Sequence, residues 1–235
     1  MRIFYAFDYF FLFLGNTICL MLGGFKKIDG FMMKIHVYSE KSDNFASDST
    51  MKPMIIIESK RKTLESLREK YPDAMIIDVT SKAQDEFVKF SPFYPNRDIP
   101  VPFSEGVLAA SVEGIWQGLK VFEDADVDRS FFSKRDMKNL KRTTRKYGPC
   151  LGHRKGIHGE ELLGYIEARK LIYLPCYKWV LENRLQKLVT TVRIISKNKP
   201  VVLLDYNTNA DVNNPKSALS HASLIKAYIE GNYPE

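Results

Sequence analysis

Three short runs of aliphatic residues, separated by long stretches of helical pattern, set the main constraint on how this chain folds. The runs lie at residues 54–58, 74–79 and 199–206 and have the length and composition typical of buried strands. Between the first two runs, residues 63–71 have helical spacing, with Thr63 as the expected N-cap. Strand, helix and strand in this order predict a small α/β unit at the start of the globular region.

Helical periodicity dominates the rest of the chain. Helices are predicted at residues 107–123, 133–147, 160–187 and 217–230. Pro175 is expected to break the third of these into two pieces, and Gly231 is expected to end the last one. Four prolines within residues 90–104 predict an ordered loop or an extended segment. The predicted fold class is therefore α+β, a mostly helical single domain with a few short strands.

The first 50 residues differ in character from the rest. Residues 9–24 are strongly apolar, but Asn16 interrupts them and no small-residue cleavage site follows, which is a poor match to a secretory signal. The run is also short of the ~20 apolar residues that a membrane-spanning helix needs. Residues 1–50 are interpreted as a leader or extension, either a misassigned start or an apolar anchor, and a membrane role is not favoured. From Met51 the sequence reads as the opening of a globular domain at 51–235.

Cysteine usage bears on the cellular compartment and on metal binding. The chain has three cysteines, Cys19, Cys150 and Cys176, an odd and sparse set that argues against a disulfide framework. This favours a reducing compartment, and a cytoplasmic location is predicted. The two later cysteines could join His153 and His158 in a zinc site, but the spacing matches no pattern of paired zinc ligands. Neither a metal nor a cofactor is therefore expected.

Positive charge gathers in one part of the chain. The formal net charge is +7, and residues 134–155 contain nine Lys or Arg with one Asp. Five cations follow neighbouring faces of the helix predicted there: Lys134, Lys138, Lys141, Arg142 and Arg145. They suit the phosphates of a small ligand or of a nucleic-acid backbone, and the arginines are the stronger signal because a guanidinium can bind phosphate through two hydrogen bonds. The alternative is a solvated basic surface.

The stretch "SVEGIWQGLK" raises the question of whether its helix faces solvent or a ligand. On a helical wheel for residues 108–122 the apolar residues form one stripe, and the opposite side holds Glu113, Trp116, Gln117 and Lys120. Glu113 and Lys120 are about 10 Å apart along the axis, so they are not a stabilising i,i+4 pair and a ligand could lie between them. The alternative is an ordinary amphipathic helix with a solvated polar face.

Two motifs in this region together resemble the NADAR family. The first is "FSPFYP" at residues 90–95, which fits a family element of Phe or Leu, Ser, any residue, Phe, Tyr or Ser, and Pro. The second is the pattern Glu-x-x-aromatic-Gln-x-x-Lys, which "SVEGIWQGLK" contains at the same spacing. The clear match covers about residues 90–122. Gly114 stands where the family often has His, and the family's later Trp-Gly element is not visible.

The resemblance implies a NADAR-like domain that cleaves the N-glycosidic bond of a ribosylated base, such as ADP-ribose that a toxin has attached to guanine in nucleic acid. Positive charge develops on the sugar in such a reaction, so Glu113 is the candidate that stabilises this charge or transfers protons. Lys120 is the candidate nucleophile, which attacks the anomeric carbon and holds the opened sugar as a Schiff base.

Ten further residues are predicted to bind the substrate. Gln117 is expected to orient ribose hydroxyls, and an aromatic residue of the two motifs is expected to stack on a base. Asp205 ends a predicted strand and His221 lies near the start of the last helix, positions that often line a site, with capping or packing as the alternative for His221. The full set is Phe90, Ser91, Phe93, Tyr94, Trp116, Gln117, Arg142, Arg145, Asp205 and His221. The alternative function is a non-catalytic module that binds ADP-ribose, NAD or a nucleic acid.

Overall fold

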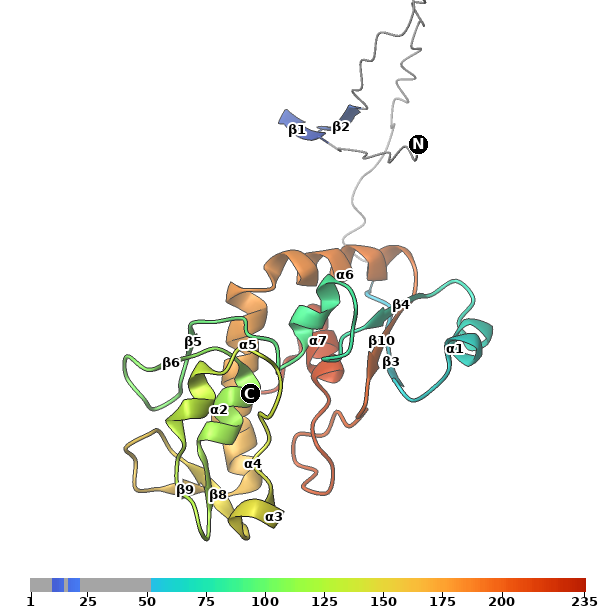
Figure 1. The fold of residues 1–235 in the computed structure, drawn as a ribbon. Helices are drawn as coiled ribbons and strands as arrows, with labels where there is room; N and C mark the ends of the chain where they lie inside the picture. Colours follow the sequence, from blue (N-terminus) through green and yellow to red (C-terminus); the bar gives the residue numbers. More distant parts are fainter. Residues whose placement is uncertain (1–9, 15–16, 22–51) are drawn as a thin grey trace, which may run out of the picture. The chain divides into compact units, whose positions relative to one another are not determined.

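The computed structural model describes residues 10–14, 17–21 and 52–235 (Figure 1). The chain divides after Ser47 into two compact units, which are described separately. In the first unit, strand β1 (Phe10–Leu14) pairs antiparallel with strand β2 (Thr17–Met21). The expectation of a misassigned start or an apolar anchor falls mostly on residues outside the described ones. Within the described part of the chain, no helix has the length and the hydrophobicity needed to cross a membrane.

A three-stranded parallel sheet forms the base of the second unit. Strands β3 (Ile55–Ser59) and β4 (Met75–Asp78) are joined through helix α1 (Leu64–Lys70), and strand β10 (Val201–Asp205) lies between them and pairs with both. The predictions of these three strands and of α1 are confirmed, as is Thr63 as the side chain that caps α1. The α+β class is likewise confirmed.

Both faces of β10 are covered, and every residue of this strand is buried. On one face its side chains pack with Leu67 of α1, and on the other they join the main core with Ile225 of α7 (His221–Glu230). Figure 1 shows α1 and α7 on opposite sides of the sheet. A strand buried on both faces needs a continuous aliphatic run, which is why this segment shows no alternation. Gly231 ends α7 with a left-handed φ of 77°, as predicted.

A long helical stretch that contains a π-helical turn packs into the same core. Helix α4 (Tyr165–Ala168), the π turn η3 (Arg169–Tyr173) and helix α5 (Leu174–Asn183) follow one another without a break. The prediction that Pro175 divides the helix is therefore wrong. The wider π turn precedes the proline and relieves the clash between its ring and the carbonyl four residues earlier. The helix α6 (Gln186–Asn198) that follows was not predicted.

The helix predicted over 107–123 is shorter than expected. Helix α2 spans only Val112–Gly118, and Lys120 begins strand β7 (Lys120–Phe122) instead of continuing the helix. Strand β7 pairs antiparallel with β8 (Cys150–Arg154). This pairing joins segments about thirty residues apart, so a local helical pattern cannot reveal it.

The helix predicted over 133–147 is wrong for most of its length. A 3-10 turn, η2 (Arg129–Ser133), precedes that region, and helix α3 (Thr144–Tyr147) forms only at its end. Between them, Met137 and Asn139 have left-handed φ angles of 55° and 52°, which cannot continue a right-handed helix. The five cations therefore do not follow the faces of one helix.

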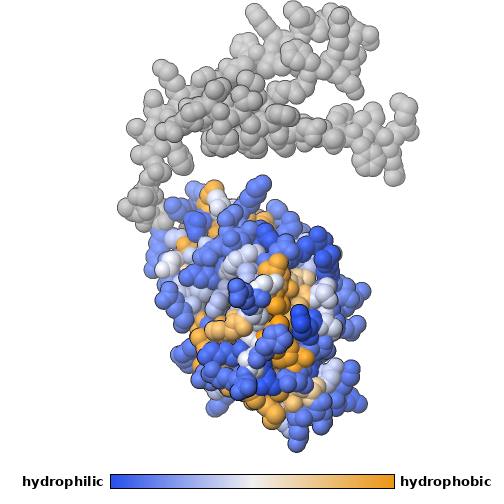
Figure 2. Space-filling model, turned by 90° about the vertical axis from the view of Figure 1, so that its left-hand side faces the viewer, coloured by the Kyte–Doolittle hydropathy of each residue, from blue (hydrophilic) through white to orange (hydrophobic). Residues whose placement is uncertain are grey.

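The remaining elements are short: η1 (Glu86–Phe90), β5 (Ile99–Pro100), β6 (Leu108–Ala109) and β9 (Leu162–Leu163). Strand β5 pairs with β6, and β9 with β8, both antiparallel. Figure 2 looks onto the side of the domain that is on the left in Figure 1 and shows an apolar band between charged regions. Large apolar side chains are exposed on or near these short strands at Phe103, Leu108 and Leu162.

Candidate active site

A pocket of ≈ 440 Å³ opens at the carboxyl-terminal edge of the parallel sheet. The segments after β4 and β10 form one wall with the start of α7, and α2, β7 and the π turn form the other. Such an edge is where open α/β sheets commonly bind ligands, and the volume lies in the usual range of about 300–1,000 Å³. Nine of the twelve predicted site residues line the pocket: Ser91, Phe93, Glu113, Trp116, Gln117, Lys120, Arg142, Asp205 and His221.

Glu113 lies in the first turn of α2 and is buried, with 8 % of its surface exposed. Its backbone N–H donates to the Pro92 carbonyl at 2.9 Å, which ties α2 to the "FSPFYP" segment. Its Oε1 accepts a hydrogen bond of 2.8 Å from Gln117 Nε2. Burial raises the pKa of Glu113, and the Gln117 hydrogen bond and the charges of Lys120 and Lys141 offset this only in part.

Lys120 reaches the same pocket from the first position of β7 and is partly buried. Burial lowers the pKa of Lys120, Glu113 and Cys150 oppose that change, and Arg142 and Lys141 reinforce it. No ion pair within 4.0 Å joins Lys120 to Glu113. Burial therefore shifts the base and the acid toward their neutral forms, with space between them.

Aromatic side chains form the wall between these groups and the π turn. Trp116 makes edge-to-face contacts with Tyr165 and Tyr173, with ring centroids 5.9 and 5.8 Å apart. On its other side Trp116 packs against His153, centroid to centroid 3.8 Å. His153 has 1 % of its surface exposed, and neither ring nitrogen has a hydrogen-bond partner. Burial, with the charge of Lys120 adding to it, lowers the pKa of His153 to about 3, so this ring is neutral.

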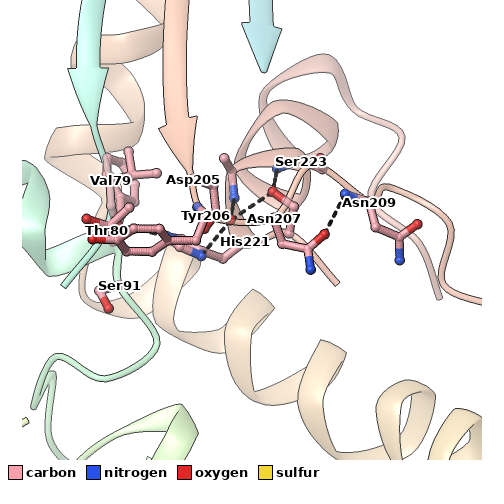
Figure 3. A network of polar contacts seen from close by, with 12 residues as sticks. Val79, Thr80, Ser91, Asp205, Tyr206, Asn207, Asn209, His221 and Ser223 are labelled. Atoms are coloured by element: carbon pink, nitrogen blue, oxygen red, sulfur yellow. Dashed lines mark hydrogen bonds and ion pairs between the residues drawn. The ribbon is translucent and has the colours of Figure 1, made fainter. Parts of the chain in front are cut away.

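Asp205 and His221 form a buried pair at the sheet edge (Figure 3). His221 Nδ1 lies 2.9 Å from Asp205 Oδ2, and Nε2 lies 2.8 Å from the carbonyl oxygen of Val79. A carbonyl only accepts, and Asp205 also accepts hydrogen bonds from Ser220 Oγ and the Tyr206 backbone N–H, so both ring nitrogens donate and His221 is an imidazolium.

The pKa shifts of this pair agree with the hydrogen bonds. Burial alone would lower the pKa of His221, but the Asp205 carboxylate and the Val79 carbonyl outweigh burial and raise it. Burial likewise opposes ionisation of Asp205, but His221, Ser220 and the Ala222 N–H outweigh it and lower the pKa of the carboxyl. His221 therefore acts as a buried cation that ties the ends of β4 and β10 together, and it is not a free base.

Arg142 has a different environment from the one that a phosphate-binding arginine needs. Its Nη1 donates to the Lys120 and Gln117 carbonyls at 2.7 and 3.3 Å, and its Nη2 donates to the Asp126 carbonyl at 2.8 Å. These bonds hold the segment of 134–155 against α2 and β7. Arg145 is exposed and does not line the pocket, so the basic side chains that face the pocket from this segment are Lys141 and Arg142.

Phe90 and Tyr94 do not line the pocket. Phe90 is fully buried in the core, where its carbonyl accepts the Tyr177 hydroxyl at 2.7 Å. Tyr94 is partly buried, and its backbone N–H donates to the Ser91 carbonyl at 2.9 Å in the turn of the motif. The prediction that Phe90 and Tyr94 bind the substrate is therefore wrong, because Phe90 is a core residue and Tyr94 lies away from the pocket, and Phe93 and Trp116 are the aromatic residues of the two motifs at the pocket.

Helix α2 is packed closely both on its polar side and at Gly114. Because Glu113 and Gln117 are buried at 8 % and 4 % exposure, the ordinary amphipathic helix with a solvated polar face is wrong. A Cβ atom at Gly114, where the NADAR pattern often has His, would lie 2.6 Å from the Phe131 carbonyl oxygen. The close approach of η2 therefore leaves no room for a side chain after Glu113 in this chain.

Several pocket residues were missed by sequence reasoning, among them Thr80, Tyr165, Arg169 and Tyr173. Arg169 and Tyr173 lie on the π turn, inside a stretch whose pattern indicates only a helix. The one signal that the sequence offers for Arg169 is an arginine beside the apolar residues of a predicted helix, because an arginine that is buried there needs partners. Within the described residues, no group of three or more His, Cys, Asp or Glu side chains is arranged to hold a metal ion.

The fold and the pocket define an α+β protein with a polar, aromatic-walled site at the edge of a parallel sheet. The chain belongs to the family of unknown function DUF6939, which matches residues 59–225, a span that contains every residue of the pocket. Comparison with curated proteins found no match, and comparison with solved structures found none either.

Proposed function

We propose that this protein is a hydrolase that cleaves the N-glycosidic bond of a ribosylated base, such as ADP-ribose on guanine in nucleic acid. The observation that carries the proposal is that Glu113 and Lys120 open into one pocket, with Phe93 and Trp116 on its wall. The resemblance of two short motifs to the NADAR family supports the same reaction. A planar base would stack on the aromatic wall while its sugar reaches the carboxyl and the amine.

The proposed reaction uses the two pKa shifts in the site. Lys120 Nζ, in its neutral form, attacks the anomeric carbon, and the bond from that carbon to the base nitrogen breaks. Glu113, in its protonated form, donates a proton to the departing base, and as a carboxylate it then accepts a proton from the amine. The bond from the anomeric carbon to the ring oxygen then breaks as Glu113 returns its proton to that oxygen, which gives an open-chain Schiff base with Lys120, and water hydrolyses this intermediate to release the sugar and restore the amine.

The test is to incubate the protein with guanine-ADP-ribosylated DNA and, separately, with ADP-ribosyl-guanosine, and to measure released ADP-ribose. Lys120→Ala and Lys120→Arg are both expected to abolish release, since a guanidinium stays protonated and is no nucleophile. Lys187→Ala, at an exposed position of α6, is the matched control and is expected to keep full activity. Borohydride added during turnover should link the sugar covalently to Lys120.

Glu113→Gln keeps the shape of the side chain and removes the acid. It should slow the reaction about a hundredfold or more, the usual size for an acid–base group. Unchanged release with Lys120→Ala would overturn the proposed nucleophile. If the natural protein releases ADP-ribose from neither substrate, the hydrolase proposal as a whole is overturned.

The second candidate function is binding of ADP-ribose, NAD or a nucleic acid without chemistry. It is favoured by the hydrogen bonds that already engage Gln117 and Asp205, which build the pocket walls in advance of any ligand. Binding without chemistry is distinguished from hydrolysis if the ligand binds at the pocket and is recovered unchanged.

A further inference from the structure

The π turn Arg169–Tyr173 contributes two side chains to the pocket, and they differ in how their polar atoms are used. Arg169 has 2 % of its surface exposed. Its terminal nitrogens donate to the Val212, Asn214 and Ser217 carbonyls at 2.8, 3.0 and 2.9 Å and to the Tyr165 hydroxyl at 2.8 Å. Arg169 therefore holds the loop after β10, which forms part of the pocket wall.

Tyr173 has no such partner. Its neighbours Tyr177 and Tyr233 donate their hydroxyls to the Phe90 and Leu174 carbonyls at 2.7 and 2.9 Å, whereas no atom of the described residues hydrogen-bonds the Tyr173 hydroxyl. That hydroxyl is also not one of the buried polar atoms that lack a partner, so it is open to the pocket that the residue lines.

The Tyr173 ring is held in place by its neighbours. It stacks on Tyr177 at 6.2 Å with an interplanar angle of 9°, and it meets Trp116 edge to face at 5.8 Å and 81°. Burial, and then the nearby charges of Glu113 and Asp205, raise the pKa of Tyr173 well above its usual value. The phenol therefore stays protonated, and its hydrogen is available to an acceptor on a ligand that displaces solvent from the pocket.

We infer that Tyr173 is a further ligand-binding residue of this pocket, which donates a hydrogen bond to an oxygen of the bound ribosyl group between Glu113 and Asp205. This identification of the acceptor rests on the proposed function, because the sugar is the part of that substrate that must reach Glu113. A π turn is a frequent feature of functional sites, and here it orients a residue that a regular helix would carry elsewhere.

The experiment measures binding of ADP-ribose by calorimetry to the natural protein, Tyr173→Phe and Tyr177→Phe. Tyr173→Phe keeps both ring contacts and should weaken binding about five- to tenfold, the size of one hydrogen bond, with an unchanged unfolding temperature. Tyr177→Phe is the matched control: it removes the bond to the Phe90 carbonyl, so it should lower the unfolding temperature and leave the affinity unchanged.

The outcomes separate this inference from the hydrolase proposal. Weaker binding by Tyr173→Phe supports the inference whether or not ADP-ribosylated guanine is cleaved. Equal affinity of Tyr173→Phe and the natural protein, or loss of folding in Tyr173→Phe, overturns the inference and leaves the hydrolase proposal standing. Failure of the natural protein to bind ADP-ribose overturns the inference, whereas the hydrolase proposal is decided by the cleavage assay.

Discussion

Gln117 donates a hydrogen bond of 2.8 Å to Glu113 Oε1, and through its own Oε1 it accepts the Arg142 backbone N–H at 3.0 Å. Both ends of its amide are thus engaged by the protein, and the amide links α2 to the segment that carries Lys141. For the predicted role of orienting ribose hydroxyls, one amide hydrogen and one lone pair of the amide oxygen are left. Gln117 is first of all a positioning residue for the Glu113 carboxyl.

Gln117→Met is the first prediction, since it keeps the shape and removes both bonds. It should destabilise the fold by about 1–3 kcal/mol, because it leaves the Glu113 carboxyl and the Arg142 N–H without partners. It should also raise the pKa of Glu113 further, because the lost bond is one that lowers it. Urea unfolding and the pH profile of the reaction measure the two effects. Gln84→Met, at an exposed position, should change stability by no more than about 0.5 kcal/mol.

The Asp205–His221 pair predicts how stability depends on pH. The pKa of His221 is raised above 6.5, so its contribution is complete below pH 6.5 and is lost as the pH rises through the folded-state value. The pKa of Asp205 is lowered below 3.8, so its contribution is complete above pH 3.8 and is lost as the pH falls through the folded-state value. The pair therefore stabilises the fold most between these two pH values.

Asp205→Asn tests this dependence. It should cost about 3 kcal/mol at pH 6, because it leaves the buried imidazolium without its carboxylate, and it should flatten the loss of stability above pH 6.5. Urea unfolding at a series of pH values measures both. His158→Gln, at an exposed histidine, is the control and should leave the dependence as it is in the natural protein. If the stability of Asp205→Asn falls above pH 6.5 as steeply as that of the natural protein, His221 is not charged in the folded state.

Gly114→Ala should destabilise the fold by about 1–3 kcal/mol, because the new methyl group meets the Phe131 backbone, which cannot move aside as a flexible side chain can. The shift of α2 should also reduce turnover, since α2 carries Glu113. Gly164→Ala is the control: its methyl group would meet only the flexible end of Glu167, at 3.3 Å. Thermal unfolding compares the two, and equal midpoints would contradict the close packing of α2 on η2.

A chain that begins at Met51 should fold by itself, because the second compact unit begins at Asp48 and holds the core, the sheet and the pocket. The expected result is a cooperative thermal transition and the same near-ultraviolet circular dichroism as the full chain. Aggregation of the shortened chain under conditions in which the full chain stays dispersed would assign the first unit a structural role.

Nucleic-acid binding through residues 134–155 remains a proposal, and its test leaves out Arg142 because that guanidinium binds backbone carbonyls. Arg135 and Lys138 are exposed and lie beside a surface depression, so changing both to Gln should weaken binding to DNA and reduce its salt dependence by about two charges. Titration at several salt concentrations measures this. Affinity and salt slope equal to those of the natural protein would leave the segment as a solvated basic surface.

The parts of this fold that the sequence predicts are those with a local signal. Aliphatic runs mark the three strands of the parallel sheet, and the cap at Thr63 marks the start of α1. The residue at which α2 ends cannot be predicted from the sequence, because the helical pattern continues past Gly118. Lys120 instead pairs with His153 of β8, which is distant in the sequence. The wheel groups Glu113 and Gln117 on one side, and the structure buries that side because another part of the chain covers it.

The remainder of the candidate site depends on contacts that no local pattern records. Tyr173 lies in an apolar helical run, a pattern typical of core residues. In the structure the π turn places it at the pocket. The sequence indicates that Arg142 binds phosphate, whereas in the structure its guanidinium donates to backbone carbonyls. Charge and motif spacing alone cannot separate a buried structural cation from a free one.

The place of β10 between β3 and β4 bears on how the protein is made. Because β3 and β4 each bond to β10 and not to each other, the ribosome releases more than a hundred residues before either strand meets its partner. During synthesis their backbone groups stay available to other chains, a hazard typical of sheets closed by late contacts. A transcript cut short before Val201 would yield a product that has most of the helices and lacks the parallel sheet, and quality control would meet it as an aggregation-prone polypeptide.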